Sequence, residues 1–168
     1  MKNNVWIINQ HISTPKLNGD GNRHYSMAKE LVKKGYDVKL IMSSFAHVPA
    51  VDVEVDKTIT IQPEEDGIDV VLVKGYEYDG SVGYGRIISM FLFLFRLFRI
   101  RINDLGKPDV IIVSSMSMLP ILYAIYLRRW KLKDVKVIFE VRDIWPLTPI
   151  QIGGYNRFHP FLLLLSWM

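Results

Sequence analysis

The sequence predicts an α/β fold, in which an open and mostly parallel sheet carries helices on both faces. Short apolar runs rich in β-branched residues alternate with helix-length segments, as in parallel sheets with crossover helices. These runs are continuously hydrophobic, which is typical of strands buried on both faces. With 168 residues, of which 49% are hydrophobic, the chain is long enough for one domain with a substantial core.

The expected elements follow one another in a regular, Rossmann-like order. The first helix is clearly bounded, because Tyr25, Ala28 and Leu31 lie on one side of it and Gly35 follows as a C-terminal cap. The section from Glu64 to Gly85 holds several glycines and acidic residues and is expected to be an irregular connection. The expected strands are Val5–Asn9, Asp37–Met42, Val70–Val73, Val110–Ser114 and Val135–Val141, with a shorter extended piece between Val51 and Ile61; the expected helices are Asn22–Lys34, Arg86–Ile102, Met118–Trp130 and a last one from about Pro160.

The clearest functional signal follows the last expected strand. Arg142 and Asp143 come directly after this apolar run, and Trp145-Pro146 then forces the chain to turn. Ligands of open α/β sheets sit outside the carboxyl ends of the strands, so charged residues at this position indicate a site. A structural ion pair, with Asp143 capping the following turn, explains the same residues equally well.

The sequence Glu-x-Arg-Asp-x-Trp-Pro at 140–146 resembles a motif of bacterial family 4 glycosyltransferases, which are retaining enzymes of the GT-B fold. The branch that builds capsule and O-antigen polysaccharide is the most similar. The beginning of the chain agrees with this resemblance, since a first strand is followed by a loop with Gly19 and Gly21, then by Arg23, a helix and Gly35. The resemblance extends over nearly all of the chain and rests on the order and spacing of short motifs.

The resemblance implies that residues 1–168 are the N-terminal, acceptor-side domain of an enzyme of cell-surface polysaccharide synthesis. The full enzyme would move a sugar from a nucleotide-sugar donor to a lipid-linked saccharide acceptor, with no metal and no further cofactor. Most donor contacts would come from a C-terminal domain that this chain lacks, so the chain alone is expected to be inactive. We take Asp143 as the candidate catalytic residue, and the candidate substrate-binding residues are Gly19, Asp20, Gly21, Arg23, Ser115 and Arg142.

The glycine loop does not fit a dinucleotide-binding fingerprint. The third glycine would have to stand where His24 is, the loop is too long, and the second strand ends without an acidic residue for a ribose. A nicotinamide or flavin enzyme is therefore disfavoured. The loop still precedes a helix N-terminus, which attracts anions, and in the resembled family it faces the cleft near the donor diphosphate and the acceptor. A solvated turn capped by Asp20 or Asn22 is the other interpretation.

Ser115 follows another expected strand, where its hydroxyl is suited to a sugar or phosphate. Capping of the next helix is by itself a sufficient explanation of the serine and is favoured over the binding role.

The segment Arg86–Ile102 is apolar on nearly all sides, and its arginines gather at one end. Such a helix is buried or in contact with lipid, and long arginine stems reach toward headgroups. We expect membrane contact, although a crossover helix between the sheet and a neighbour explains the apolar residues too. The resemblance also implies a cytoplasmic protein attached peripherally to the inner face of the plasma membrane. The candidate contact residues are Phe93, Arg96, Phe98 and Arg99.

Several other classes are disfavoured. The absence of cysteine excludes disulfides and thiolate metal sites, and the four histidines lack metal-ligand spacing, so no metal is expected. The basic run at Arg128–Lys131 is interpreted as the last turn of a helix and not as a nucleic-acid site. The net charge of +4 is compatible with anionic lipids or nucleotides.

The apolar run at 161–168 has no cap or polar tail, so we expect the sequence to be one domain of a longer protein. Two other functions stay open from the sequence. One is a membrane-attached binding or scaffold domain without catalysis. The other is a different Rossmann-type enzyme, such as a nucleotide-sugar epimerase.

Overall fold

The computed structural model describes residues 3–18, 23–47, 50–63, 66–79, 84–115, 118–142 and 147–151, together with residues 154, 156, 158, 160, 162 and 163. The six strands of the main sheet are β1 (Asn4–Ile8), β2 (Asp37–Ser43), β5 (Ile59–Pro63), β6 (Asp69–Val73), β7 (Val110–Ser114) and β8 (Lys136–Glu140). A separate hairpin consists of β3 (Phe45–His47) and β4 (Ala50–Asp52). The helices are α1 (Pro15–Asn18), α2 (Arg23–Lys33), α3 (Tyr84–Leu97), α4 (Ile102–Leu105), α5 (Pro120–Tyr126), the π-helical η1 (Leu127–Lys131) and α6 (Leu147–Gln151).

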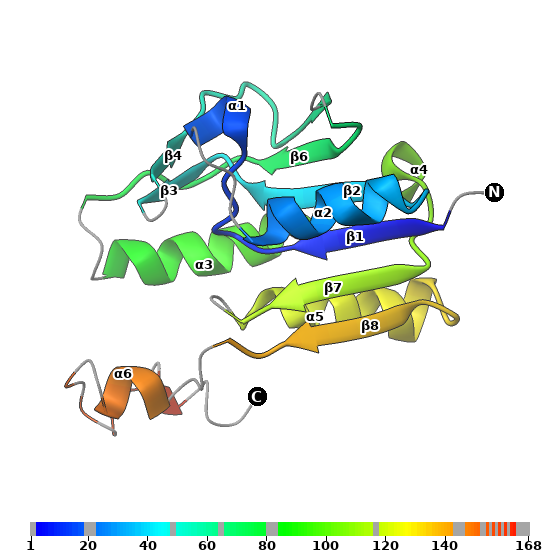
Figure 1. Ribbon diagram of the computed structural model, residues 1–168. Helices are drawn as coiled ribbons and strands as arrows, with labels where there is room; N and C mark the ends of the chain where they lie inside the picture. Colours follow the sequence, from blue (N-terminus) through cyan, green and yellow to red (C-terminus); the bar gives the residue numbers. More distant parts are fainter. Residues whose placement is uncertain are drawn as a thin grey trace.

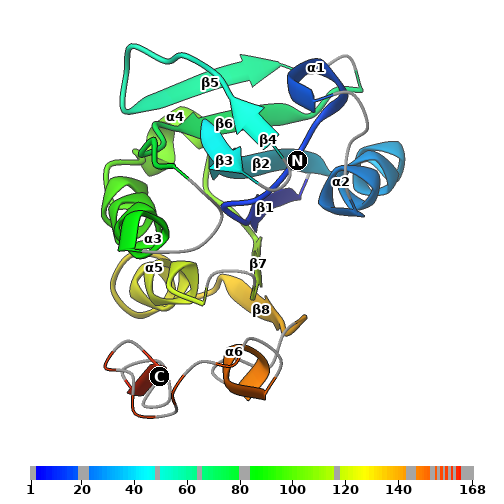
Figure 2. The same cartoon turned by 90° about the vertical axis from the view of Figure 1, so that its left-hand side faces the viewer.

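The main sheet has the order β5-β6-β2-β1-β7-β8. Every neighbouring pair is parallel except β5 with β6, which is antiparallel. Helix α2 covers one face of this sheet, and α3 and α5 lie side by side on the other (Figures 1 and 2). The predicted α/β fold with a mostly parallel sheet and helices on both faces is therefore confirmed.

The central strands are continuously apolar because they are buried on both faces. Successive side chains of a strand point to opposite faces. Trp6 and Ile8 accordingly pack in the core beneath α3 and α5, whereas Val5 and Ile7 pack in the core beneath α2. This two-sided burial accounts for the uninterrupted hydrophobic runs from which the strands were predicted.

The boundaries differ from the prediction where helices end. The helix expected over Arg86–Ile102 stops at Leu97, because the amides of Arg99 and Ile100 bond carbonyls three residues back and tighten the last turn. The helix expected over Met118–Trp130 is present as α5 followed by η1. Of the helix expected from about Pro160, only isolated positions are described.

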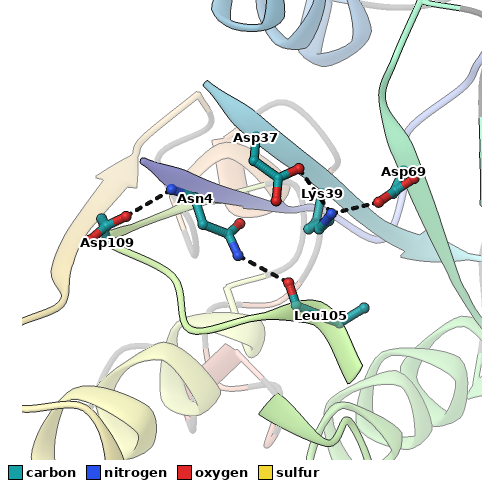
Figure 3. Close-up of polar contacts among 6 residues, drawn as sticks. All are labelled: Asn4, Asp37, Lys39, Asp69, Leu105 and Asp109. Carbon is teal, nitrogen blue, oxygen red and sulfur yellow. Dashed lines mark hydrogen bonds and ion pairs between the residues drawn. The ribbon is translucent and has the colours of Figure 1, made fainter. Parts of the chain in front are cut away.

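The amino-terminal edge of the sheet is held by a network of polar contacts (Figure 3). Lys39 is only 8% exposed, and its Nζ lies 2.9 Å from Asp37 Oδ1 and 2.5 Å from Asp69 Oδ2. Burial opposes the charge of Lys39, but hydrogen bonds to the two carboxylates outweigh burial and raise the pKa of the ammonium group. On the neighbouring strand, the amide of Asn4 donates to Asp109 and its side chain donates to the Leu105 carbonyl.

We predict that the double variant Asp37→Asn, Asp69→Asn unfolds with a free energy about 2 kcal/mol lower. Removing both partners leaves a buried ammonium group unpaired, and the partial exposure of the carboxylates reduces the usual penalty. Adding Lys39→Met to these two changes should restore most of the loss, because the unpaired charge is then gone. Urea unfolding at neutral pH measures all three proteins, and a triple variant as unstable as the double would contradict this explanation.

Candidate functional site

The order of the strands identifies where a ligand would bind. The strand order reverses at β1: β2 and β6 follow on one side of it, and β7 and β8 on the other. The helices that come after β1 and β7 in the chain lie on opposite faces of the sheet (Figure 2). Ligands of open α/β sheets bind at this reversal, outside the carboxyl ends of the strands. In Figure 1 the arrowheads of β1, β2, β7 and β8 point to this edge, and α3 begins on the same side.

The segment that leaves β1 at this edge is polar and yet buried. Asn9, Gln10, His11, Ser13 and Thr14 are all buried, and Ser43 and Ser44 at the end of β2 are buried beside them. Burying polar groups costs free energy unless they are hydrogen-bonded. A buried polar edge of this kind is typical of a site and not of a simple connection.

Two side-chain atoms of this segment keep bonding capacity. Asn9 Oδ1 accepts from the His11 amide at 2.9 Å, and Gln10 Nε2 donates to Ser89 Oγ of α3 at 2.8 Å. Asn9 Nδ2 and Gln10 Oε1 are buried without a hydrogen-bond partner among the described residues. One donor and one acceptor at the carboxyl edge thus have no described partner.

A second group at this edge joins the start of α2 to the end of β8. Arg23 Nη1 forms an ion pair with Glu140 Oε1, and His24 Nε2 lies 3.0 Å from Glu140 Oε2. The His24 side chain is fully buried, whereas that of Arg23 is 64% exposed. Glu140 is therefore held by a buried imidazole on one oxygen and by a solvent-facing guanidinium on the other.

The protonation states of this group follow from its surroundings. Burial lowers the pKa of His24 and outweighs the opposing effect of the Glu140 carboxylate, so the imidazole is neutral and donates its Nε2–H. Burial alone would raise the pKa of Glu140, but the hydrogen bond from His24 and the charge of Arg23 bring it below its usual value. The edge consequently presents an ionised, oriented carboxylate next to an exposed arginine, which suits recognition of hydroxyl and anionic groups together.

Ser115 and Arg142 lie at the same edge. The Arg142 amide donates to Ser115 Oγ at 2.6 Å, and the Ser115 amide donates to the Glu140 carbonyl at 3.0 Å. Ser115 does not cap α5, because that helix begins at Pro120 and its N-cap position is Leu119. The serine instead joins the ends of β7 and β8, and it is buried, while Arg142 is exposed.

The structure thus brings together three of the predicted site residues, Arg23, Ser115 and Arg142, through Glu140 and its strand. Gly19, Asp20, Gly21 and Asp143 lie outside the described residues. The sequence analysis assigned no role to Glu140 or His24. For Glu140, the available signal was a carboxylate at the end of an apolar strand. A polar run directly after another apolar strand marks Asn9, Gln10 and His11.

The prediction of membrane contact needs a correction at Phe93. This ring is only 2% exposed and packs in the core, so Phe93 cannot face a lipid surface. Arg96 donates to the carbonyls of Lys74 and Gly75, so its guanidinium is bound to the end of β6. Phe98 and Arg99 are exposed, as expected.

The outward side of α3 nevertheless carries large apolar side chains. Tyr84, Ile88, Phe95 and Phe98 recur at spacings that place them on one stripe, opposite the buried face of the helix. Phe95 is 63% exposed. The helix is therefore core on one side and exposed aromatic surface on the other. Within the described part of the chain, no helix is long and apolar enough to cross a bilayer.

No protein-family model matches the chain, and no curated protein matches it. Among the described residues there is no cluster of three or more histidine, aspartate or glutamate side chains that could hold a metal ion.

We predict that the buried His11 makes the protein sensitive to mild acid. Burial, assisted by the charge of Arg86, lowers the pKa of His11 to about 4 in the folded chain, against 6.5 when unfolded. The unfolded chain therefore binds the proton first, and stability is lost as the pH falls from 6.5 toward 4. Between pH 7 and pH 5 this amounts to about 2 kcal/mol.

Urea unfolding at the two pH values measures this loss, and His11→Gln should reduce it by most of that amount whatever its stability at pH 7. His24 and Glu140 titrate in both proteins, so the difference between the two pH dependences isolates His11. An unchanged pH dependence in the variant would contradict the prediction.

Proposed function

We propose that this chain is the acceptor-side domain of a retaining glycosyltransferase that uses a nucleotide-sugar donor and a lipid-linked saccharide acceptor. The observation that carries the proposal is the Glu140 carboxylate, held by Arg23 and His24 at the carboxyl edge of the sheet. Glu140 opens the Glu-x-Arg-Asp-x-Trp-Pro motif through which the sequence resembles family 4 glycosyltransferases. The proposed context is cell-surface polysaccharide synthesis at the cytoplasmic face of the membrane.

In this proposal the chain binds and orients the acceptor. An acceptor hydroxyl forms a bond to the anomeric carbon of the donor sugar, the bond to the nucleotide diphosphate breaks, and the departing diphosphate takes up the hydroxyl proton. Asn9 and Gln10 supply a buried donor and acceptor for saccharide hydroxyls, and Glu140 fixes the position of Arg23. Exposed cations such as Arg23 and Arg142 favour the charge that develops on the departing diphosphate. Most donor contacts belong to a second domain.

Among the alternatives, the epimerase receives the least support. A dinucleotide site needs a tight turn between the first strand and its helix, whereas here α1 lies between β1 and α2. A membrane-attached binding domain without catalysis is favoured by one observation, the exposed apolar stripe of α3. That stripe is compatible with the transferase too, because a lipid-linked acceptor is presented at a membrane.

We predict that Glu140→Gln, in the enzyme extended to its full coding sequence, raises the KM for the saccharide acceptor about 10- to 100-fold. The change weakens the hydrogen bonds and the ion pair that hold Arg23 and His24, and bonds to charged groups are each worth about 1.5–3 kcal/mol. The KM for the nucleotide sugar should change much less, because its contacts are expected in the other domain. Transfer of labelled sugar to extracted lipid-linked saccharide measures both constants.

Glu77→Gln is the matched control, since Glu77 is exposed and forms no ion pair with a described residue. Asp143→Ala tests the candidate catalytic residue in the same assay and should lower turnover strongly. Equal effects of Glu140→Gln on both KM values would contradict the assignment of this chain to the acceptor side. Absence of transfer from any nucleotide sugar by the full-length protein would favour the binding domain.

We also predict that Phe95→Ser weakens binding to phosphatidylcholine–phosphatidylglycerol vesicles about tenfold. Its ring is largely exposed, and burying a phenyl group in a membrane interface gains on the order of 1.5 kcal/mol. Ile61→Ser is the control, because Ile61 is also exposed but lies on β5, away from α3. Co-sedimentation measures both variants, and equal losses would show that the α3 stripe has no special part in attachment.

A further inference from the structure

An open hollow of about 570 Å³ lies between the helix formed by α5 and η1 and the edge strand β8. Its lining combines three cations with two aliphatic side chains. Ile125, Arg128 and Arg129 are three and four residues apart and therefore share one face of the helix. Lys133 comes from the turn that follows, and Val137 comes from β8.

The positive charge of this hollow is uncompensated. The side chains of Arg128, Arg129 and Lys133 form no hydrogen bond or ion pair with another described residue, and Asp134, next in sequence to Lys133, does not pair with them. Three like charges around one concavity repel each other and attract an anion. The helix that carries two of them is a π-helix, closed by the bond from the Leu132 amide to the Leu127 carbonyl at 2.7 Å, and such turns frequently occur at functional sites.

The helix that lines the hollow also carries exposed aromatic side chains. Trp130 is 67% exposed, and its ring centroid lies 5.5 Å from that of Tyr126. The Tyr126 ring in turn lies 5.0 Å from that of Phe98, at the end of α3. A continuous row of rings therefore runs from η1 to Phe98, the last residue of the apolar stripe. The row crosses the place where α5 packs against α3.

A helix that carries both cations and exposed apolar side chains is typical of a membrane interface, where headgroup phosphates lie beside acyl chains. We propose that this hollow binds the phosphate headgroup of an anionic phospholipid, while the neighbouring rings of Trp130 and Phe98 enter the interface. A nucleic acid or a soluble phosphate would use the cations but leave Ile125, Val137 and the rings in water. The inference rests on the membrane attachment contained in the proposed function and adds a specific headgroup site to it.

The test uses the whole chain and vesicles of phosphatidylcholine with and without phosphatidylglycerol. The triple variant Arg128→Gln, Arg129→Gln, Lys133→Gln should lose binding to the anionic vesicles on the order of a hundredfold, from about a factor of five for each cation near such a surface. The control Lys34→Gln, Lys57→Gln, Lys107→Gln lowers the net charge from +4 to +1 in the same way, because it also removes three charges. It should lose less than about threefold, since distant charges are screened.

Urea unfolding serves as the control for folding. Both triple variants are expected to fold, because the substituted side chains are exposed. Equal losses in the two variants would overturn the site, because net charge alone would then explain attraction to the vesicles. Binding that is undiminished when phosphatidylglycerol is left out would overturn it too. Displacement from the vesicles by inorganic phosphate or by a single-stranded oligonucleotide at matched ionic strength would assign the hollow to a soluble ligand.

Sugar transfer by the full-length enzyme to an acceptor in detergent micelles separates this inference from the proposed function. If the triple variant at Arg128, Arg129 and Lys133 loses vesicle binding but no form of the enzyme transfers sugar, the headgroup site is supported and the transferase function is contradicted. If the enzyme transfers sugar but the triple variant binds vesicles as before, the transferase function is supported and the headgroup site is contradicted.

Discussion

The central position of β1 is the constraint on which the rest of the structure depends. Its two edges are paired by β2 and β7, and its two faces are covered by the core under α2 and the core under α3 and α5. The chain that leaves β1 therefore emerges between two buried layers, where backbone and side chains have little access to water. This explains why Asn9, Gln10 and His11 are polar and buried at once, and why their hydrogen bonds run to neighbouring elements.

The two edges of the sheet differ in what their polar groups contact. At the amino edge, Lys39 is enclosed by two carboxylates, and Asn4 donates to both a side chain and a carbonyl, while its Oδ1 is buried without a described partner. At the carboxyl edge, Asn9 and Gln10 each retain a buried atom without a described partner, and Glu140 connects a buried imidazole to an exposed guanidinium. Unpartnered atoms occur at both edges, but those of Asn9 and Gln10 lie at the edge where ligands of open α/β sheets bind.

The sequence predicted the central strands well because each is a short apolar run buried on both faces, whereas the edge strands β5 and β8 are only partly buried. It could not predict that β5 pairs antiparallel with β6, since that pairing depends on partners and not on local pattern. The contact between His24 and Glu140 spans 116 positions and exists only after the sheet has formed. Phe93 was placed on the wrong side of α3 because nearly every position of that helix is apolar, so the sequence carries no signal for which face packs on the sheet.

The geometry of α3 links the candidate site to the exposed aromatic surface. This helix begins at the carboxyl edge, and Ser89 on its buried face accepts a hydrogen bond from Gln10. Ile88, the preceding residue, lies on the outward stripe with Tyr84 and Phe95. Two faces of the same helix therefore carry the contact with the polar edge and the exposed apolar side chains. In the proposed function, a lipid-linked acceptor would place its hydrocarbon chain against the outward stripe and its saccharide toward the polar edge, whereas a soluble saccharide would use only the edge.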